Sequence, residues 1–166
     1  MKTQKSIRSL PQGFTLIELL VVIGILAILL AITLVAINPA KQFAQANNTK
    51  READVNALLN AIDQYASDHN GTLPGSLSAG NVSTPTDIAN TGVDLCSALV
   101  PTYIAALPSD PTSTDASTNG QISGCPTPYD TAYQVENISG GAGRISVSAS
   151  YAQAINGVTP SIVVTR

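Results

Sequence analysis

In the first apolar stretch of the chain, residues 14–37, Glu18 is the residue whose side chain could take part in chemistry. It is the one charged residue between Phe14 and Ile37, and this run also lacks proline. About 20 apolar residues in a helix span the hydrocarbon core of a bilayer, so the run is long enough to cross a membrane. A carboxylate costs roughly 2.5–3.5 kcal/mol at the centre of such a segment and less near its end, where Glu18 lies. The position predicts a membrane helix whose carboxylate has a function and needs a partner.

The residues around Glu18 follow a distinctive order. A basic segment with Lys2, Lys5 and Arg8 comes first, Gly13 follows, and Phe14-Thr15-Leu16-Ile17-Glu18 opens the apolar run. This order resembles the precursors of type IV pilins and of type II secretion pseudopilins, because glycine, aromatic residue and glutamate fall at that family's spacing. The resemblance covers residues 1–40, and the remainder of the chain matches the family only in pattern.

The resemblance implies a path of processing and assembly. A prepilin peptidase in the membrane would cut after Gly13, the last residue of leader 1–13, and would N-methylate Phe14, the new first residue. Glu18 would be the residue on which assembly depends. Helix 14–37 would form the core of a homopolymeric filament, built by an inner-membrane assembly machinery. The chain would start as a single-pass inner-membrane protein with a cytoplasmic leader, and would end in an extracellular or periplasmic filament.

Two alternatives compete for the amino-terminal segment. An ordinary signal anchor would also be apolar, with Glu18 snorkelling to the interface, but it gains nothing from glycine, phenylalanine and glutamate at this spacing. A cleaved secretory signal would have an apolar core of about 7–15 residues that ends in small residues, and the run here is longer. The pilin-like interpretation therefore explains more of the residues.

Charge is unevenly distributed along the chain. Charged residues make up only 11% of the sequence, which is low for a soluble domain. No Lys or Arg occurs between Arg51 and Arg144, whereas ten acidic residues do. Without residues 1–13 the chain keeps five basic and eleven acidic residues, a formal net charge of −6. An acidic domain repels phosphate backbones, so we expect no nucleic-acid partner.

The two cysteines, Cys96 and Cys125, lie far beyond the apolar run. The basic residues that precede the run favour a cytoplasmic amino terminus, which would put later residues outside the cytoplasm. In an oxidising compartment a disulfide between the two is the default, and a pair of unpaired buried thiols is the alternative. Two cysteines by themselves do not supply the four ligands of a structural zinc site.

An amphipathic helical segment is expected over 38–70. Pro39 predicts a kink near Asn38, with a complete helix break as the alternative. An apolar stripe at helical spacing then predicts one face packed on a domain core; it comprises Val55, Leu58, Leu59, Ile62, Tyr65 and Ala66. Asn70-Gly71 predicts the end of the helix. His69, the one histidine, is interpreted as a helix-end residue and not as a catalyst.

Residues 71–128 are rich in Gly, Pro, Ser and Thr and predict a connecting loop region. One ordered island is expected, a short helix over 95–100 that Asp94 caps, followed by a second helical turn over 101–108. The core anchors of the island would be Leu95, Leu99, Ile104 and Leu107. The stretch 107–111, Leu-Pro-Ser-Asp-Pro, resembles a segment that precedes the sheet in many pseudopilins and related pilins.

Chemistry that would indicate an enzyme is missing from the sequence. There is no Gly-rich phosphate loop before a helix, no paired histidines and no convincing Ser-His-Asp set. Asp110, Asp115, Asp130 and Asn119 could ring a calcium ion, but the twelve-residue calcium-loop pattern is absent and solvated loop acids are the preferred interpretation. We therefore predict no enzymatic activity, no metal site and no cofactor.

Residues 129–166 predict an antiparallel sheet of about three strands. Tyr133 and Val135 alternate with polar neighbours, residues 145–151 alternate in the same way, and 162–164 closes the chain. Turns are expected at 139–143 and at Asn156-Gly157. One face of such a sheet must be covered, and the stripe on 38–70 is the available cover. The predicted fold class is α+β, with a long amino-terminal helix packed on a small carboxy-terminal antiparallel sheet, as in pilins.

The favoured function is that of a structural subunit in a type IV pilus-like filament. A pseudopilin of a type II secretion system is the alternative within the family. A DNA-uptake (competence) pilin is less favoured because of the acidic composition, and a membrane-anchored enzyme because no catalytic set is present. Neighbouring genes for a secretion channel or a retraction motor would separate the first two.

Overall fold

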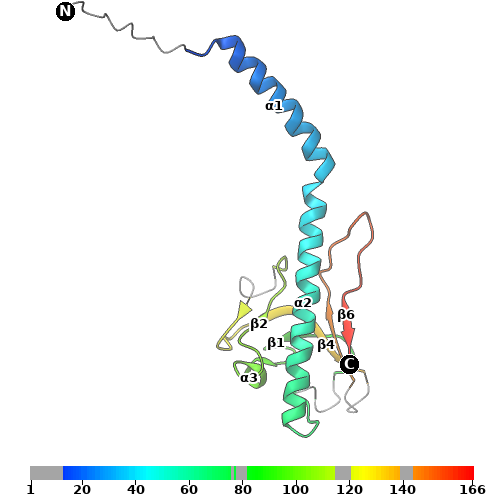
Figure 1. Ribbon diagram of the computed structural model, residues 1–166. Helices are drawn as coiled ribbons and strands as arrows, with labels where there is room; N and C mark the ends of the chain where they lie inside the picture. The colour runs from blue at the N-terminus through cyan, green and yellow to red at the C-terminus, as the bar shows by residue number, and fades with distance from the viewer. Residues whose placement is uncertain (1–12, 76, 78–81, 115–120, 139–143) are drawn as a thin grey trace, which may run out of the picture. The chain divides into compact units, whose positions relative to one another are not determined.

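The computed structural model describes residues 13–75, 77, 82–114, 121–138 and 144–166. The chain divides into two compact units, Met1–Pro39 and Ala40–Arg166. The first unit contains helix α1, and the second contains the buried core and every strand of the described residues (Figure 1).

Helix α1 (Leu16–Ile37) has 22 residues, and none of them is buried. Every large apolar side chain on this helix is at least half exposed. Among the described residues, one helical stretch, Leu16–Asp68, is long and apolar enough to cross a membrane, and its most apolar window has a mean hydropathy of 3.2. The apolar helix predicted over 14–37 is therefore present, and it starts two residues later because Thr15 is its N-cap.

Asn38 interrupts the helical run before α2 (Pro39–Asp68). Its backbone is left-handed, with φ 45° and ψ 79°. The structure thus has the helix break and not the kink that the sequence favoured. The ring of Pro39 disfavours a right-handed helical conformation in the preceding residue, asparagine tolerates the left-handed one, and proline is well suited to open a helix.

Helix α2 carries the apolar stripe that packs on the domain core. Val55, Leu58, Leu59 and Ile62 are fully buried, while Tyr65 and Ala66 are partly buried against the same cluster. The helix ends as predicted, since the Gly71 N–H donates to the Ala66 carbonyl at 2.7 Å and Asn70 is left-handed, which is a Schellman cap. The stripe prediction is confirmed.

The main sheet has four strands in the order β1-β4-β5-β6. They are β1 (Thr86–Ala89), β4 (Asp130–Asn137), β5 (Ile145–Ala149) and β6 (Val163–Thr165), and every pairing is antiparallel. Tyr133 and Val135 on β4 and Val147 on β5 are fully buried, as their alternation predicted. Figure 1 shows α2 lying across this sheet, and side chains from both elements form one hydrophobic cluster.

The sequence-based count of about three strands misses β1, which lies in the region expected to be a loop. Thr86 pairs with Val135 and Ala89 with Asp130, with a register irregularity between Asp87 and Ala89. The strand is only four residues long and sits among Thr, Pro and Asn, so it has no apolar alternation of its own. Its partner lies more than 40 residues away, and the pairing stabilises what local sequence does not.

The rest of the region 71–128 contains α3 (Cys96–Leu99) and a two-stranded sheet of β2 (Leu107–Pro108) and β3 (Gln121–Ile122). The N-cap of α3 is Leu95 and not the expected Asp94, although the Asp94 carboxylate accepts the Cys96 N–H at 3.0 Å. Residues 101–108 form turns and β2 in place of the expected helical turn. Of the four expected anchors, Leu95, Leu99 and Leu107 are fully buried and Ile104 is partly buried.

The segment after β5 differs from the alternating strand expected over 145–151. Strand β5 ends at Ala149, and Tyr151 is 41% exposed in the following turn. Asn156 and Gly157 both have positive φ, and Ile155 bridges Val158 across them, which confirms the predicted tight turn. The turn expected at 139–143 lies outside the described residues.

Candidate functional site

Glu18 is held at the start of α1 by reciprocal hydrogen bonds with Thr15. The Thr15 N–H donates to Glu18 Oε2 at 2.9 Å, and the Glu18 N–H donates to Thr15 Oγ1 at 3.3 Å. The Thr15 hydroxyl also donates to Oε2, at 2.6 Å. This capping box satisfies N–H groups that have no partner within the first turn of a helix. It fixes the beginning of α1 at Leu16, so that Gly13 and Phe14 lie outside the helix.

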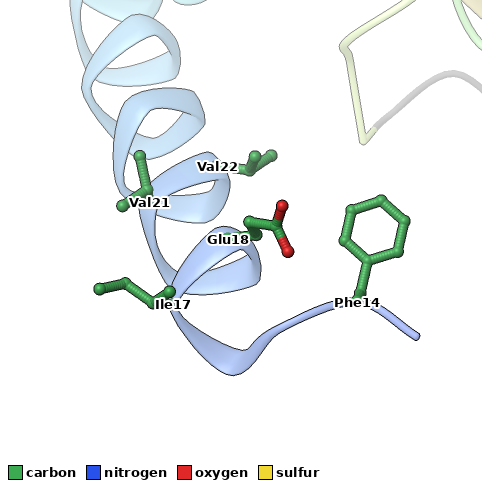
Figure 2. Close-up of a pocket in the computed structure, with 5 residues that line it drawn as sticks. All are labelled: Phe14, Ile17, Glu18, Val21 and Val22. Carbon is green, nitrogen blue, oxygen red and sulfur yellow. The ribbon is translucent and has the colours of Figure 1, made fainter. Parts of the chain in front are cut away.

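The carboxylate of Glu18 lies in an apolar groove at this helix end. Figure 2 shows the five residues at this helix end, with Phe14, Glu18 and Val22 toward the right of the view and Ile17 and Val21 toward the left. Together these five residues line a shallow open groove. The Phe14 side chain is 87% exposed. The structure therefore brings two of the sequence-predicted site residues, Phe14 and Glu18, onto one surface next to the peptide bond that the prediction assigns to the peptidase.

Gly13 has no structural requirement for glycine in this fold. A Cβ placed on it would meet no atom within 4 Å, and its φ is not in the left-handed region. A larger residue at this position would therefore cause neither a clash nor backbone strain. A need for glycine here must come from something outside the chain, which is what recognition by a peptidase would impose.

Cys96 and Cys125 form the predicted disulfide, with their Cα atoms 5.5 Å apart. Cys96 is fully buried in α3, and Cys125 packs against the same core cluster. The bond therefore ties α3 to the segment between β3 and β4, in a part of the chain with little regular structure. This explains how a region rich in Gly, Pro, Ser and Thr stays attached to the core.

The other residues considered for chemistry have structural roles in the described chain. His69 stacks on Tyr65 with ring centroids 3.9 Å apart, and its Nδ1 lies 2.8 Å from the Tyr65 carbonyl. Asp110 is bound to Arg51, and the Asp130 carboxylate accepts the Ala132 N–H. No group of three or more metal-ligating side chains occurs among the described residues. The calcium candidates Asp115 and Asn119 lie outside them.

The sequence reasoning missed a buried ion pair between Arg51 and Asp110. Both side chains are fully buried. Arg51 Nε donates to Asp110 Oδ2 at 2.6 Å, and Arg51 Nη2 donates to Oδ1 at 3.0 Å, which is a bidentate pairing. The signal that could have found it is the position of Arg51 four residues before Val55, on the apolar stripe of α2. A cation on that stripe needs a buried partner.

Asp110 is held by more than the guanidinium. Its Oδ1 also accepts the N–H groups of Thr112 and Ser113, at 2.8 and 3.0 Å. Burial raises the pKa of the Asp110 carboxyl, but the hydrogen bonds from Arg51 and Thr112 together outweigh burial and leave the pKa below its ordinary value. The pair joins α2 to the loop after β2.

A second polar contact joins α2 to the sheet. The Tyr133 hydroxyl on β4 donates to Asp54 Oδ2 at 2.8 Å, and Lys50 Nζ contacts the same oxygen at 2.7 Å. Burial, together with the hydrogen bond to Asp54, raises the pKa of Tyr133. Helix α2 is thus joined by side-chain hydrogen bonds to β4 as well as to the loop after β2.

Comparison with known proteins identifies the amino-terminal motif. The family model described as the prokaryotic N-terminal methylation motif matches residues 8–34. This motif is the class III signal peptide of type IV pilins and pseudopilins. No curated protein and no solved structure matches the chain. The amino-terminal segment of the chain is thus similar to that of type IV pilins and pseudopilins, and the long helix packed on a small antiparallel sheet is a pilin-like α+β fold.

Proposed function

We propose that this protein is a structural, non-enzymatic subunit of a type IV pilus-like filament, assembled through α1 after cleavage by a prepilin peptidase. The observation that carries the proposal is the 22-residue apolar helix, none of whose residues is buried within its own chain. Such a surface is not stable in water and must be covered by lipid or by other protein. A bilayer would cover it before assembly, and the same helix of other subunits would cover it in the filament.

The first step of the proposed path is removal of residues 1–13. Cleavage after Gly13 would give Phe14 a free amine, which the peptidase would then methylate. The basic leader would lie in the cytoplasm, and the unit Ala40–Arg166 would lie outside the inner membrane. The subunit would later move into an extracellular or periplasmic filament.

The second step is assembly, in which Glu18 needs a cationic partner. When helices pack in a filament core, Glu18 and the Phe14 amine are both removed from water, and buried opposite charges are tolerated only when they are paired. The amine of a neighbouring chain is the proposed partner, and the chain's own amine competes with it. In the unassembled chain Thr15 satisfies Oε2 of Glu18. The pair between subunits would set the axial register of one chain against the next.

The test is filament yield from the Glu18→Ala variant relative to the subunit pool in the membrane. We expect normal processing at Gly13 and membrane insertion, with little or no polymer. Glu18→Gln separates hydrogen bonding from charge, because it keeps an acceptor and loses the charge. Thr33→Ala is the matched control, since it also removes a polar group from α1. Normal filaments from correctly processed Glu18→Ala protein would refute the pairing and favour a simple anchor.

A role as a type II secretion pseudopilin is the second candidate, because the amino-terminal motif is shared by type IV pilins and pseudopilins. The stretch 107–111 resembles a segment of many pseudopilins and related pilins, and in this chain its aspartate makes the buried ion pair with Arg51. Electron microscopy of cells that express the gene separates the candidates, because long surface filaments under ordinary expression favour a pilus. Secretion of a substrate that stops when the gene is deleted favours a pseudopilin.

A further inference from the structure

Exposed apolar side chains outside α1 are concentrated in two segments. In the described part of the second unit, large apolar residues are exposed at five positions, and three of these, Phe43, Tyr151 and Val158, lie at the start of α2 or in the loop after β5. Phe43 is 71% exposed and Val158 is 69% exposed, the highest values among the five. We refer to these three residues as the Phe43–Val158 surface.

Hydrogen bonds hold the two segments of this surface together. Asn47 Nδ2 donates to Gln153 Oε1 at 2.8 Å, Asn48 Nδ2 donates to the Gln153 carbonyl at 2.8 Å, and the Gln153 N–H donates to Asn48 Oδ1 at 2.9 Å. Phe43 lies four residues before Asn47 and so shares its face of α2. Figure 1 shows the loop between β5 and β6 running beside the first half of α2. The tight turn that ends at Val158 belongs to this loop.

The same two segments carry no acidic residue, although the protein is acidic. All ten acids after Glu18 lie between Glu52 and Glu136. The start of α2, residues 39–51, contains Lys41, Lys50 and Arg51 and no carboxylate, and residues 150–162 contain no charge of either sign. An apolar surface without negative charge can approach the anionic headgroups of a bilayer, whereas the acidic remainder of the unit is repelled by them.

The chain itself keeps Phe43 close to the membrane span. Helix α1 has 22 residues, or about 33 Å at 1.5 Å per residue, which matches a hydrocarbon core of about 30 Å. Phe43 follows Ile37 by six residues. The rise from Pro39 to Phe43 within α2 is about 6 Å, and the two steps across the break at Asn38 add at most about 7 Å, so the Phe43 backbone stays within about 13 Å of the end of α1. The headgroup layer extends roughly 5–7 Å beyond the core on each side, and a helical side chain points back over the preceding turn, so the chain keeps the ring within reach of that layer.

From these observations we propose that the Phe43–Val158 surface rests in the headgroup layer of the bilayer while the subunit is in the membrane. The occupant of the surface is lipid. Tyr151 would act as an interfacial aromatic anchor, and Phe43 would insert its apolar ring as such residues of interfacial helices do. Val158 would place the tip of the loop beside them. The inference rests on the proposed membrane anchoring by α1 and adds a second, shallower contact that assembly must break. It would also restrict how the unit Ala40–Arg166 is oriented before polymerisation.

Tryptophan fluorescence tests the proposal directly, because the natural chain contains no tryptophan. The full chain, carrying F43W or V158W, is placed at high dilution in vesicles of phosphatidylethanolamine and phosphatidylglycerol that contain brominated lipid. L26W, in the middle of α1, reports the depth of the span. I138W is the matched control, since Ile138 is also an exposed apolar residue, at 47%. It lies beside Arg144, near the start of β5, whereas Gln153 and the loop that carries Val158 follow the end of that strand.

We expect F43W and V158W to lose most of their emission when bromine is near the headgroup and little when it is at the end of the acyl chain. L26W should show the reverse order, and I138W should be quenched by neither lipid. If F43W and V158W behave like I138W while L26W is quenched, the surface does not contact lipid and the proposal is overturned, although the anchor stands. If L26W is also unquenched, α1 does not lie in the bilayer, and the membrane anchoring in the proposed function is refuted together with this proposal.

A second copy of the chain is the competing occupant, and the same variants detect it. Contact between subunits would make the emission of F43W and V158W depend on the ratio of protein to lipid, with no quenching by shallow bromine at high dilution. That result would overturn lipid as the occupant. Emission that is independent of this ratio, together with shallow quenching, supports the proposal.

Discussion

We predict that Arg51→Met lowers the free energy of unfolding of the unit Ala40–Arg166 by about 3–5 kcal/mol. Removing one partner leaves the Asp110 carboxylate fully buried without its bidentate donor, and it is this uncompensated charge, more than the lost contact, that is costly. Domains are commonly stable by only about 5–15 kcal/mol, so the loss is a large share of the total. Urea unfolding of the full chain in detergent, followed by near-ultraviolet circular dichroism of its tyrosines, measures it.

Lys50→Met is the matched control for this prediction. It is the same substitution at the adjacent position, but the Lys50 side chain is 42% exposed and its ion pair with Asp54 is of the i, i+4 type. Such a pair contributes roughly 0.2–1 kcal/mol. A double variant, Arg51→Met with Asp110→Asn, removes the buried charge while keeping an acceptor for Thr112 and Ser113, and should recover part of the loss. Arg51→Met that costs no more than Lys50→Met would refute the reasoning.

The pH dependence of the same pair has a definite sign. In the native chain the pKa of Asp110 is below its ordinary value, so the carboxylate contributes stability at pH values above that ordinary value, and this is lost as pH falls through the lowered pKa. Without Arg51, burial would instead raise the pKa, and the folded state would accept the neutral acid more readily than the charged one. The difference in stability between the native chain and Arg51→Met should therefore shrink as the pH falls from the raised pKa of the variant to the lowered pKa of the native chain.

Three further predictions concern processing, the disulfide and nucleic acid. Mass spectrometry of purified filaments should find a chain that begins at N-methyl-Phe14, and a mature start other than the bond after Gly13 would contradict the processing proposal. Reducing the bond between Cys96 and Cys125, which are 29 residues apart, should lower stability by about 3.5 kcal/mol in the chain-entropy model, and two reactive thiols in denatured, unreduced protein would disprove the bond. The chain should not shift DNA in a gel near physiological salt, because residues 52–143 hold ten acidic residues and no Lys or Arg, and sub-micromolar binding would revive the DNA-uptake alternative.

Local pattern determined the elements that depend on near neighbours in the sequence. The apolar run and the Thr15–Glu18 spacing are sufficient for α1 and its cap, because a helix start needs only residues three apart. The apolar stripe of α2 follows from apolar residues at helical spacing, and the burial pattern of β4 and β5 follows from apolar residues at every second position. In each case the pattern marks the one face that is buried. The tight turn at Asn156-Gly157 follows from backbone conformations that those two residue types tolerate.

Tertiary structure alone decided the contacts between distant segments. Strand β1 exists because Thr86 meets Val135, and its own four residues have no pattern that requires a strand. Arg51 and Asp110 are 59 residues apart, so a cation in a helix and an acid in a Pro-rich loop look like two solvated charges until the fold buries them together. Gln153 likewise joins its loop to α2 through a hydrogen bond to Asn47, which is 106 residues away in the sequence. The physical reason is that a polar group must have a hydrogen-bonding partner once it is buried, whereas the same group on the surface is satisfied by water. Which polar groups are buried is decided by the whole fold and not by the neighbouring sequence.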